Sequence, residues 1–171
     1  MAVPQQKFRE IVFRMLYSYD MGKPEEEEIV NLLMKELSVT KKIVNTAQEK
    51  VKKILEKQQE IDTYITKTTI SYEFERIQRV EVNILRLGIY ELFFEETIPP
   101  KVAIAEAIRL SRKFGTPESA SFVNAILDNI YKASLGEQID TKEITESVEA
   151  MKKSEIIANE AAKTQQQPDE S

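Results

Sequence analysis

The sequence contains neither cysteine nor histidine among its 171 residues. Without cysteine it has no disulfide, no thiolate nucleophile and no cysteine-ligated zinc or iron–sulfur site. Without histidine it lacks the commonest metal ligand, which is also the side chain that most often transfers protons near neutral pH. No glycine-rich phosphate loop or nucleophile-elbow motif is present. We therefore expect a protein that is not an enzyme, with no catalytic residues, no bound metal and no cofactor.

Only 4 glycines and 6 prolines interrupt the chain, which favours long helices over a strand-rich fold with many tight turns. No apolar stretch approaches the roughly 20 residues that a membrane-spanning helix needs. The N-terminus also lacks the basic and apolar segments of a secretory signal. The sequence therefore predicts an all-α protein located in the cytoplasm.

The net charge of −5 is unevenly distributed along the chain. Residues 135–171 hold nine of the 29 acidic residues and four of the 24 basic ones, so residues 1–134 hold 20 of each. A neutral body can carry a local basic face, and the total charge therefore does not exclude a nucleic-acid partner. We predict a domain at 5–134 and an acidic tail at 135–171, with a helix at 139–160 followed by disorder.

Apolar residues recur at the spacing of one helical face along most of the chain. The clearest stripes begin at Phe8, Ile29, Ile43, Ile77, Ala103 and Phe122. The stripe from Ile77 is apolar around much of the helix circumference, which indicates a central helix. Thr116 and Pro117 are predicted to cap and begin the last core helix.

Residues 59–77 are less regular than the rest of the body. The run 66–71 is rich in β-branched residues, which fit a helix poorly. We expect only a short helix near 61–65 and a turn near 72–77 in this segment.

Four blocks carry a resemblance to a known family. They are residues 82–92 (VNILRLGIYEL), 98–108 (IPPKVAIAEAI), 113–119 (KFGTPES) and 122–128 (FVNAILD). These blocks resemble the C-terminal half of the NusB family, where the pattern is ILRxAxYEL, IPxxVAINEAxxLAxxFG and FVNGVLD. Near the N-terminus, Arg9-Glu10 and Met15-Leu16-Tyr17 resemble the family's opening R-E…AL-Y. The resemblance covers residues 7–132 and is weak between 23 and 76.

The resemblance implies a NusB-like fold of about seven helices in two three-helix sub-bundles, followed here by a tail. It also implies a transcription antitermination factor that binds boxA-like RNA together with NusE, a small-subunit ribosomal protein. Such a pair joins the RNA polymerase antitermination complex during ribosomal RNA transcription. The expected oligomeric state is a monomer or a homodimer.

We predict RNA contacts at Lys7, Arg9, Arg86, Lys101, Phe122 and Asn124. The resemblance favours this role for Arg86 and for the corner formed by Phe122 and Asn124. Arg86 lies in an apolar segment, where its permanent charge requires a partner or a groove open to solvent. The alternative to an RNA contact is an internal salt bridge, for which the candidates are Glu81, Glu106 and Asp128.

Phe122 is expected either to stack on a splayed RNA base or to lie in the core. Asn124 is expected to read a base edge or to bond a neighbouring helix end. Lys101 begins a helix, where the dipole disfavours positive charge; a phosphate contact explains it, and simple exposure is the alternative. Arg109, Arg112 and Lys113 are explained by the favourable C-terminal end of their helix.

The resemblance places Tyr17, Glu75 and Glu81 on the side that faces NusE. The two acids suit a basic ribosomal partner, and a merely solvated helix face is the alternative. The N-terminus offers only Lys7 and Arg9 where the family commonly has an arginine-rich stretch. Fewer phosphate contacts imply weaker RNA binding with a shallower salt dependence.

Other functions remain open at this point. The chain is alternatively a regulatory NusB-like domain that assists an RNA-modifying partner chain, or a structural protein whose tail drives self-association. For the tail itself, one hypothesis is that residues 137–160 fold back over the basic face and compete with RNA. The other is a solubilising appendage.

Overall fold

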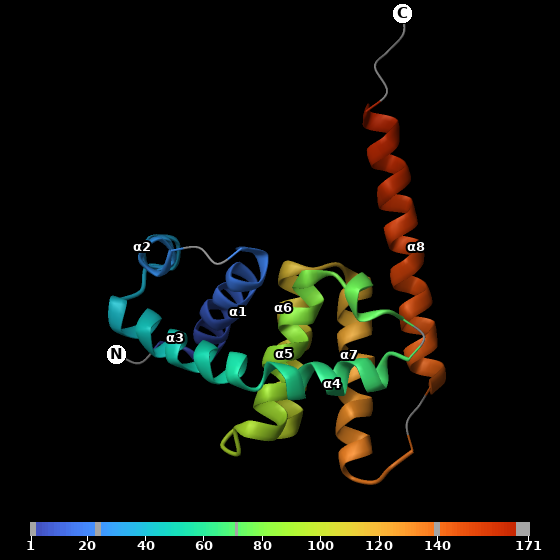
Figure 1. The fold of residues 1–171 in the computed structure, drawn as a ribbon, viewed down its shortest axis with the longest axis horizontal. Helices are drawn as coiled ribbons and strands as arrows, with labels where there is room; N and C mark the ends of the chain where they lie inside the picture. The colour runs from blue at the N-terminus through green and yellow to red at the C-terminus, as the bar shows by residue number, and fades with distance from the viewer. Residues whose placement is uncertain (1–2, 23–24, 71, 139–140, 167–171) are drawn as a thin grey trace, which may run out of the picture.

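The computed structural model describes residues 3–22, 25–70, 72–138 and 141–166, and in this part of the chain every regular element is a helix (Figure 1). The elements are α1 (Gln5–Gly22), α2 (Glu26–Leu37), α3 (Lys41–Glu56), α4 (Gln58–Thr68), the 3-10 helix η1 (Phe74–Arg76), α5 (Arg79–Phe94), α6 (Pro100–Phe114), α7 (Pro117–Ser134) and α8 (Thr141–Gln166). No helix among these is long and apolar enough to cross a membrane. The predicted all-α fold is confirmed, with eight α-helices in the described residues against about seven expected.

The helices form two neighbouring bundles. In the first, α1 and α2 pack against α3, and in the second α5, α6 and α7 pack against one another while α4 crosses α5 and α7. Figure 1 shows the first bundle in blue and cyan beside the second in green to orange. The main contact between the bundles is made by α1 against α5.

The central position of α5 follows from its sequence. All residues from Glu81 to Glu91 are buried, as expected for a helix that is apolar on nearly all sides. A glycine at position 88 lets α7 come close, because a Cβ atom there would lie 3.0 Å from Leu127 Cδ1. The predicted central helix is thus confirmed, although it begins at Arg79 and not at Ile77.

The corner between α6 and α7 is closed by local hydrogen bonds. The Thr116 hydroxyl accepts a hydrogen bond from the Ser119 amide, and the Ser119 hydroxyl accepts one from the Thr116 amide, both at 3.2 Å. This reciprocal capping box satisfies two amides that a helix start otherwise leaves unpaired. Pro117 occupies the first turn of α7, so the predicted start of this helix is confirmed.

The segment 59–77 differs from expectation because its helix is longer. α4 continues to Thr68 instead of stopping near residue 65. Threonine hydroxyls of this helix donate to backbone carbonyls of the preceding turn, as Thr68 does to Tyr64 at 2.8 Å. Threonine hydroxyls commonly bond in this way within helices, and α4 keeps its β-branched residues helical to Thr68. Next along the chain, η1 takes the place of the predicted turn.

The acidic tail contains α8, which packs along α7. Ile144, Val148 and Met151 are buried against the rest of the protein. The Tyr72 hydroxyl lies 2.9 Å from the Glu155 carboxylate, and the Lys152 ammonium lies 5.5 Å from the centre of the Tyr72 ring. The helix continues to Gln166, beyond the expected end at 160, whereas residues 139–140 lie outside the described residues. The division into a domain and a tail stays a prediction.

Replacing Gly115 by alanine is expected to destabilise the corner between α6 and α7. A Cβ at this position would lie 2.9 Å from the Ser111 carbonyl oxygen and 2.9 Å from the Ser119 side chain. Crowding of this kind should lower the free energy of unfolding by about 1–3 kcal/mol, measurable by urea denaturation. Gly22→Ala is the matched control, because nothing lies within 4 Å of a Cβ there. Equal stability of the two variants would contradict the steric argument.

Candidate nucleic-acid and partner interface

The cations predicted to face RNA divide into a buried and a surface group. The side chains of Arg9 and Arg86 are only 7% and 4% exposed. Lys7 is half-buried and Lys101 is exposed. Only Lys7 and Lys101 therefore present their charge to solvent.

Arg9 forms an ion pair at the joint between the two bundles. Its Nε atom lies 3.0 and 3.1 Å from the two carboxylate oxygens of Glu91 on α5. Glu106 on α6 lies 3.8 Å from its guanidinium, and Lys50 on α3 lies 3.7 Å from Glu91. A buried charge requires such compensation, and Arg9 thus ties α1 to α5 and α6.

Arg86 also forms an internal salt bridge, but its partners differ from the candidates inferred from sequence. Its Nε and Nη2 atoms each donate to one oxygen of Asp62 at 2.9 Å. Asp20 lies 3.6 Å from Nη1. The expected partners Glu81, Glu106 and Asp128 are therefore wrong, because α4 and the end of α1 bring other acids over α5.

Phe122 and Glu81 lie in the interior. Phe122 is 0% exposed, and its ring meets the Tyr72 ring edge-on at 6.4 Å between centroids. This is the core position that the sequence left open, and in this conformation the ring has no surface on which a base can stack. Glu81 is 1% exposed and accepts a hydrogen bond from the Ser119 hydroxyl. Burial raises the pKa of the Glu81 carboxyl.

Asn124 lies at the surface beside a cavity of about 460 Å³ between α6 and α7. The cavity is lined by Ile108, Arg112, Pro117, Ala120, Ser121 and Asn124. The sequence pattern had explained Arg112 only as a charge at a helix end. Arg112 follows Ile108 by four residues on α6, and this spacing indicates that both side chains lie on one face of the helix.

The neighbours of Arg112 are neutralised within the protein. Arg109 lies 2.8 Å from Glu106 and 3.1 Å from Glu10, while Lys113 lies 2.9 Å from Glu10. Arg112 is exposed and forms no ion pair with the described residues. It is thus the cation of this turn that remains available to an outside anion.

Tyr17 lines a second cavity, which opens between the two bundles. This cavity of about 430 Å³ is lined by Phe13, Arg14, Tyr17, Ser18, Ile29, Leu32, Leu33, Glu36, Val80 and Phe114. Its surface is mostly apolar, and Leu32 is 54% exposed there. Glu75 is exposed on η1 and does not line this cavity. Of the three predicted partner residues, Tyr17 and Glu75 reach the surface and Glu81 does not.

Comparisons with known proteins agree with this architecture. The sequence profile of the NusB family matches residues 6–132. Transcription antitermination protein NusB of Chlamydia pneumoniae is 43% identical over 131 residues, which cover 77% of this chain and 82% of that protein. The protein of the same name from Chloroherpeton thalassium is 28% identical over 160 residues, 93% of this chain and 76% of that protein.

Solved structures share the fold. A Thermotoga maritima NusB structure superposes with a TM-score of 0.67 at 33% identity, covering 85% of this chain and 99% of that one. A crystal structure of antitermination factors NusB and NusE in complex with dsRNA superposes with a TM-score of 0.64 at 28% identity. The match covers 75% of this chain and 96% of that one.

Asp20 at the end of α1 should make stability depend on pH. The Arg79 guanidinium, bonded at 2.6 and 2.8 Å, lowers the pKa of the Asp20 carboxyl, and the Asn83 amide reinforces this against the opposing effect of burial. A lowered pKa stabilises the fold above the unfolded value of about 3.9, and this contribution is lost as pH falls through the folded value.

Asp20→Asn is therefore expected to lower the free energy of unfolding by about 1–2 kcal/mol at pH 6. Urea unfolding at pH 6 and pH 3 should show that the difference from the unmodified protein narrows at the lower pH. A difference of the same size at both pH values would contradict the assignment.

Proposed function

The chain belongs to the NusB family, and on this basis we propose that it is a non-enzymatic transcription antitermination factor. It binds a boxA-like RNA together with NusE and acts within the RNA polymerase antitermination complex in ribosomal RNA transcription. Its place of action is then the cytoplasm. The observation that carries the proposal is the family match from α1 to α7, supported by the likeness to the NusB–NusE complex with dsRNA.

The RNA surface of this proposal is the edge formed by the start of α1 and the outer faces of α6 and α7. Its direct contacts are Lys7, Lys101 and Asn124, to which the structure adds Arg112 as an exposed cation. α1 and α6 are held side by side at this edge, where the Gln6 amide lies 3.3 Å from Glu106. Cations that reach the solvent supply the electrostatic attraction that binding to a phosphate backbone requires.

The buried members of the predicted set have a different role in this proposal. Arg9 and Arg86 hold α1, α4 and α5 together through ion pairs, and Phe122 fills the core beneath α7. They fix the relative positions of the helices that carry the exposed contacts. Their effect on RNA binding is thus indirect.

The partner surface of the proposal is the apolar cavity at Tyr17 with acidic groups near it. Exposed Leu32 and the rings of Phe13 and Phe114 offer an apolar surface that an aliphatic side chain of NusE can fill. Glu75 is an exposed acid suited to a basic ribosomal protein. Glu81 is buried and does not contact NusE in this proposal. It accepts a hydrogen bond from Ser119 and so helps to fix the start of α7.

The RNA surface is tested by Lys101→Ala, measured against a boxA oligonucleotide with NusE at several salt concentrations. Affinity should fall several-fold, and the slope of log K against log salt should become shallower by about 0.7, because one phosphate contact to a single strand is lost. Lys163→Ala is the control, since Lys163 is exposed near the end of α8, and this end of the helix extends past the bundles (Figure 1). An unchanged slope would exclude Lys101 from the interface, and equal affinity for boxA and a scrambled RNA would refute specific binding.

The partner surface is tested by Leu32→Asp, measured by calorimetric titration with NusE. A carboxylate that is taken out of water in this mostly apolar cavity should weaken binding by at least about tenfold. Because Leu32 is exposed in the free protein, the circular dichroism spectrum should not change. Leu55→Asp on α3, where the leucine is 38% exposed, is the matched control. Equal weakening by both variants would rule out the cavity as the docking site.

A further inference from the structure

The cavity between α6 and α7 has two kinds of wall. Ile108, Pro117 and Ala120 form an apolar side, in which Ala120 is buried and Ile108 is half-buried. Arg112, Ser121 and Asn124 form a polar side, and all three are exposed. With a volume of about 460 Å³, the cavity has room for a planar ring with its attached sugar.

The polar side presents unused hydrogen-bonding groups. Ser121 and Asn124 lie one turn apart on α7, so their side chains share one face of the helix. Neither side chain bonds another described residue, in contrast to the Thr116 and Ser119 hydroxyls at the same helix start. An asparagine amide offers a donor and an acceptor side by side, which match the adjacent acceptor and donor of adenine.

Arg112 adds a positive charge at the rim. Its neighbours Arg109 and Lys113 are paired with acids, whereas Arg112 is paired with none in the described part of the chain. A guanidinium binds a phosphate through two parallel hydrogen bonds. The cavity therefore combines a base-sized apolar surface, a base-reading amide and a phosphate ligand.

We propose that this cavity binds one unstacked adenine nucleotide of a single-stranded RNA. The base packs against Ile108, Pro117 and Ala120, the Asn124 amide bonds its edge, and Arg112 binds the adjoining phosphate. Single-stranded RNA is generally recognised through splayed bases of this kind. This inference rests on the proposed RNA-binding function and assigns a specificity site within it.

The test is a scan of a boxA oligonucleotide in which each nucleotide in turn is made abasic. The full chain is titrated with each RNA in the presence of NusE, and the scan is repeated with Asn124→Ala and with Arg112→Ala. At one adenine, loss of the base should weaken binding to the unmodified protein by about fivefold to a hundredfold. Loss of the same base should weaken binding to Asn124→Ala much less, because that variant already lacks the hydrogen bond from the Asn124 amide to the base.

Replacing that adenine by purine riboside, which lacks the amino group, should weaken binding to the unmodified protein but not to Asn124→Ala. Arg112→Ala should weaken binding to all the RNAs and reduce the salt dependence. Asn45→Ala, at an exposed asparagine of α3, is the matched control and should follow the unmodified protein. Because Asn124 and Arg112 are exposed, both variants should retain the unmodified melting temperature.

The outcomes separate the cavity from the wider function. If the protein binds boxA specifically but no abasic position affects the unmodified protein more than Asn124→Ala, the nucleotide site is overturned. The proposed antitermination role is then unaffected. If the position whose effect disappears in Asn124→Ala is a pyrimidine, the assignment of adenine is overturned. Failure of the unmodified protein to bind boxA with NusE would overturn both.

Discussion

The architecture depends on the ion pairs that fasten α1 to the second bundle. Near its start α1 presents Arg9 to Glu91, and at its end Asp20 receives Arg79, so both ends are held by charge. Removing one member of the buried pair Arg9 and Glu91 leaves the other with only a longer contact, of 3.8 Å to Glu106 or 3.7 Å to Lys50. Breaking a buried pair typically costs about 3–5 kcal/mol, and we expect these remaining contacts to reduce that cost. The candidate RNA surface runs from α1 to α6 and α7, and the candidate partner cavity lies between the bundles. The ion pairs and the buried apolar face of α1 therefore together fix the positions of both surfaces.

The fold was predictable because its determinants are local in sequence. The apolar stripe of α5, the Thr116 cap and the first-turn proline of α7 each act over a few residues. The ion pairs were not predictable, because Arg9 and Glu91 are 82 residues apart and Arg86 and Asp62 are 24 apart. Sequence analysis recognised that Arg86 needs a partner, but its identity depends on how α4 crosses α5. Phe122 begins an apolar helical stripe, which already allowed the core position that the structure shows. The burial of Glu81 was not predictable, because it depends on the distant Ser119, 38 residues away in sequence.

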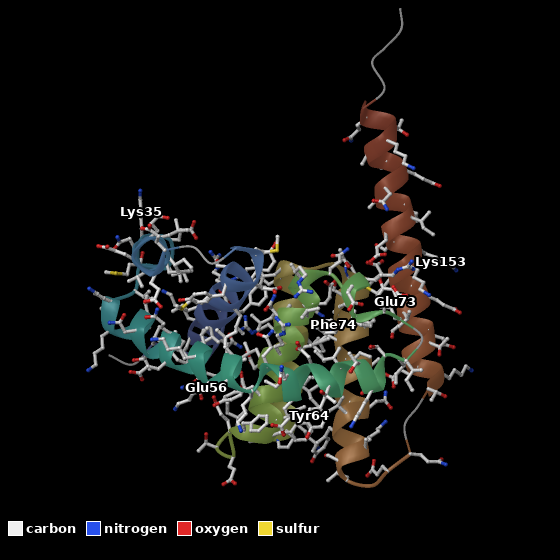
Figure 2. The ribbon with its side chains drawn as sticks, viewed as in Figure 1. Lys35, Glu56, Tyr64, Glu73, Phe74 and Lys153 are labelled. Carbon is white, nitrogen blue, oxygen red and sulfur yellow. The ribbon has the colours of Figure 1, made fainter. Side chains whose placement is uncertain are left out.

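The acidic tail adds a structural element outside the family match, which ends at residue 132. α8 uses three buried apolar side chains and the Tyr72 contacts to pack on α7, and its far half extends past the bundle with no other helix beside it (Figure 2). It leaves Lys101, Arg112 and Asn124 exposed, so it does not fold back over them. The long alignment with the Chloroherpeton protein indicates that at least one relative carries a comparable extension.

The distribution of positive charge limits how the proposed RNA surface can bind RNA. Arg9, Arg86, Arg109 and Lys113 are all committed to acids within the fold, which leaves few cations on the candidate edge. Three phosphate contacts to a single strand correspond to a salt slope of only about −2, too shallow for binding dominated by charge. Affinity must then come from directional contacts to bases and from the neighbouring protein. A neutral body with a few exposed cations is consistent with a factor that recognises RNA jointly with its partner.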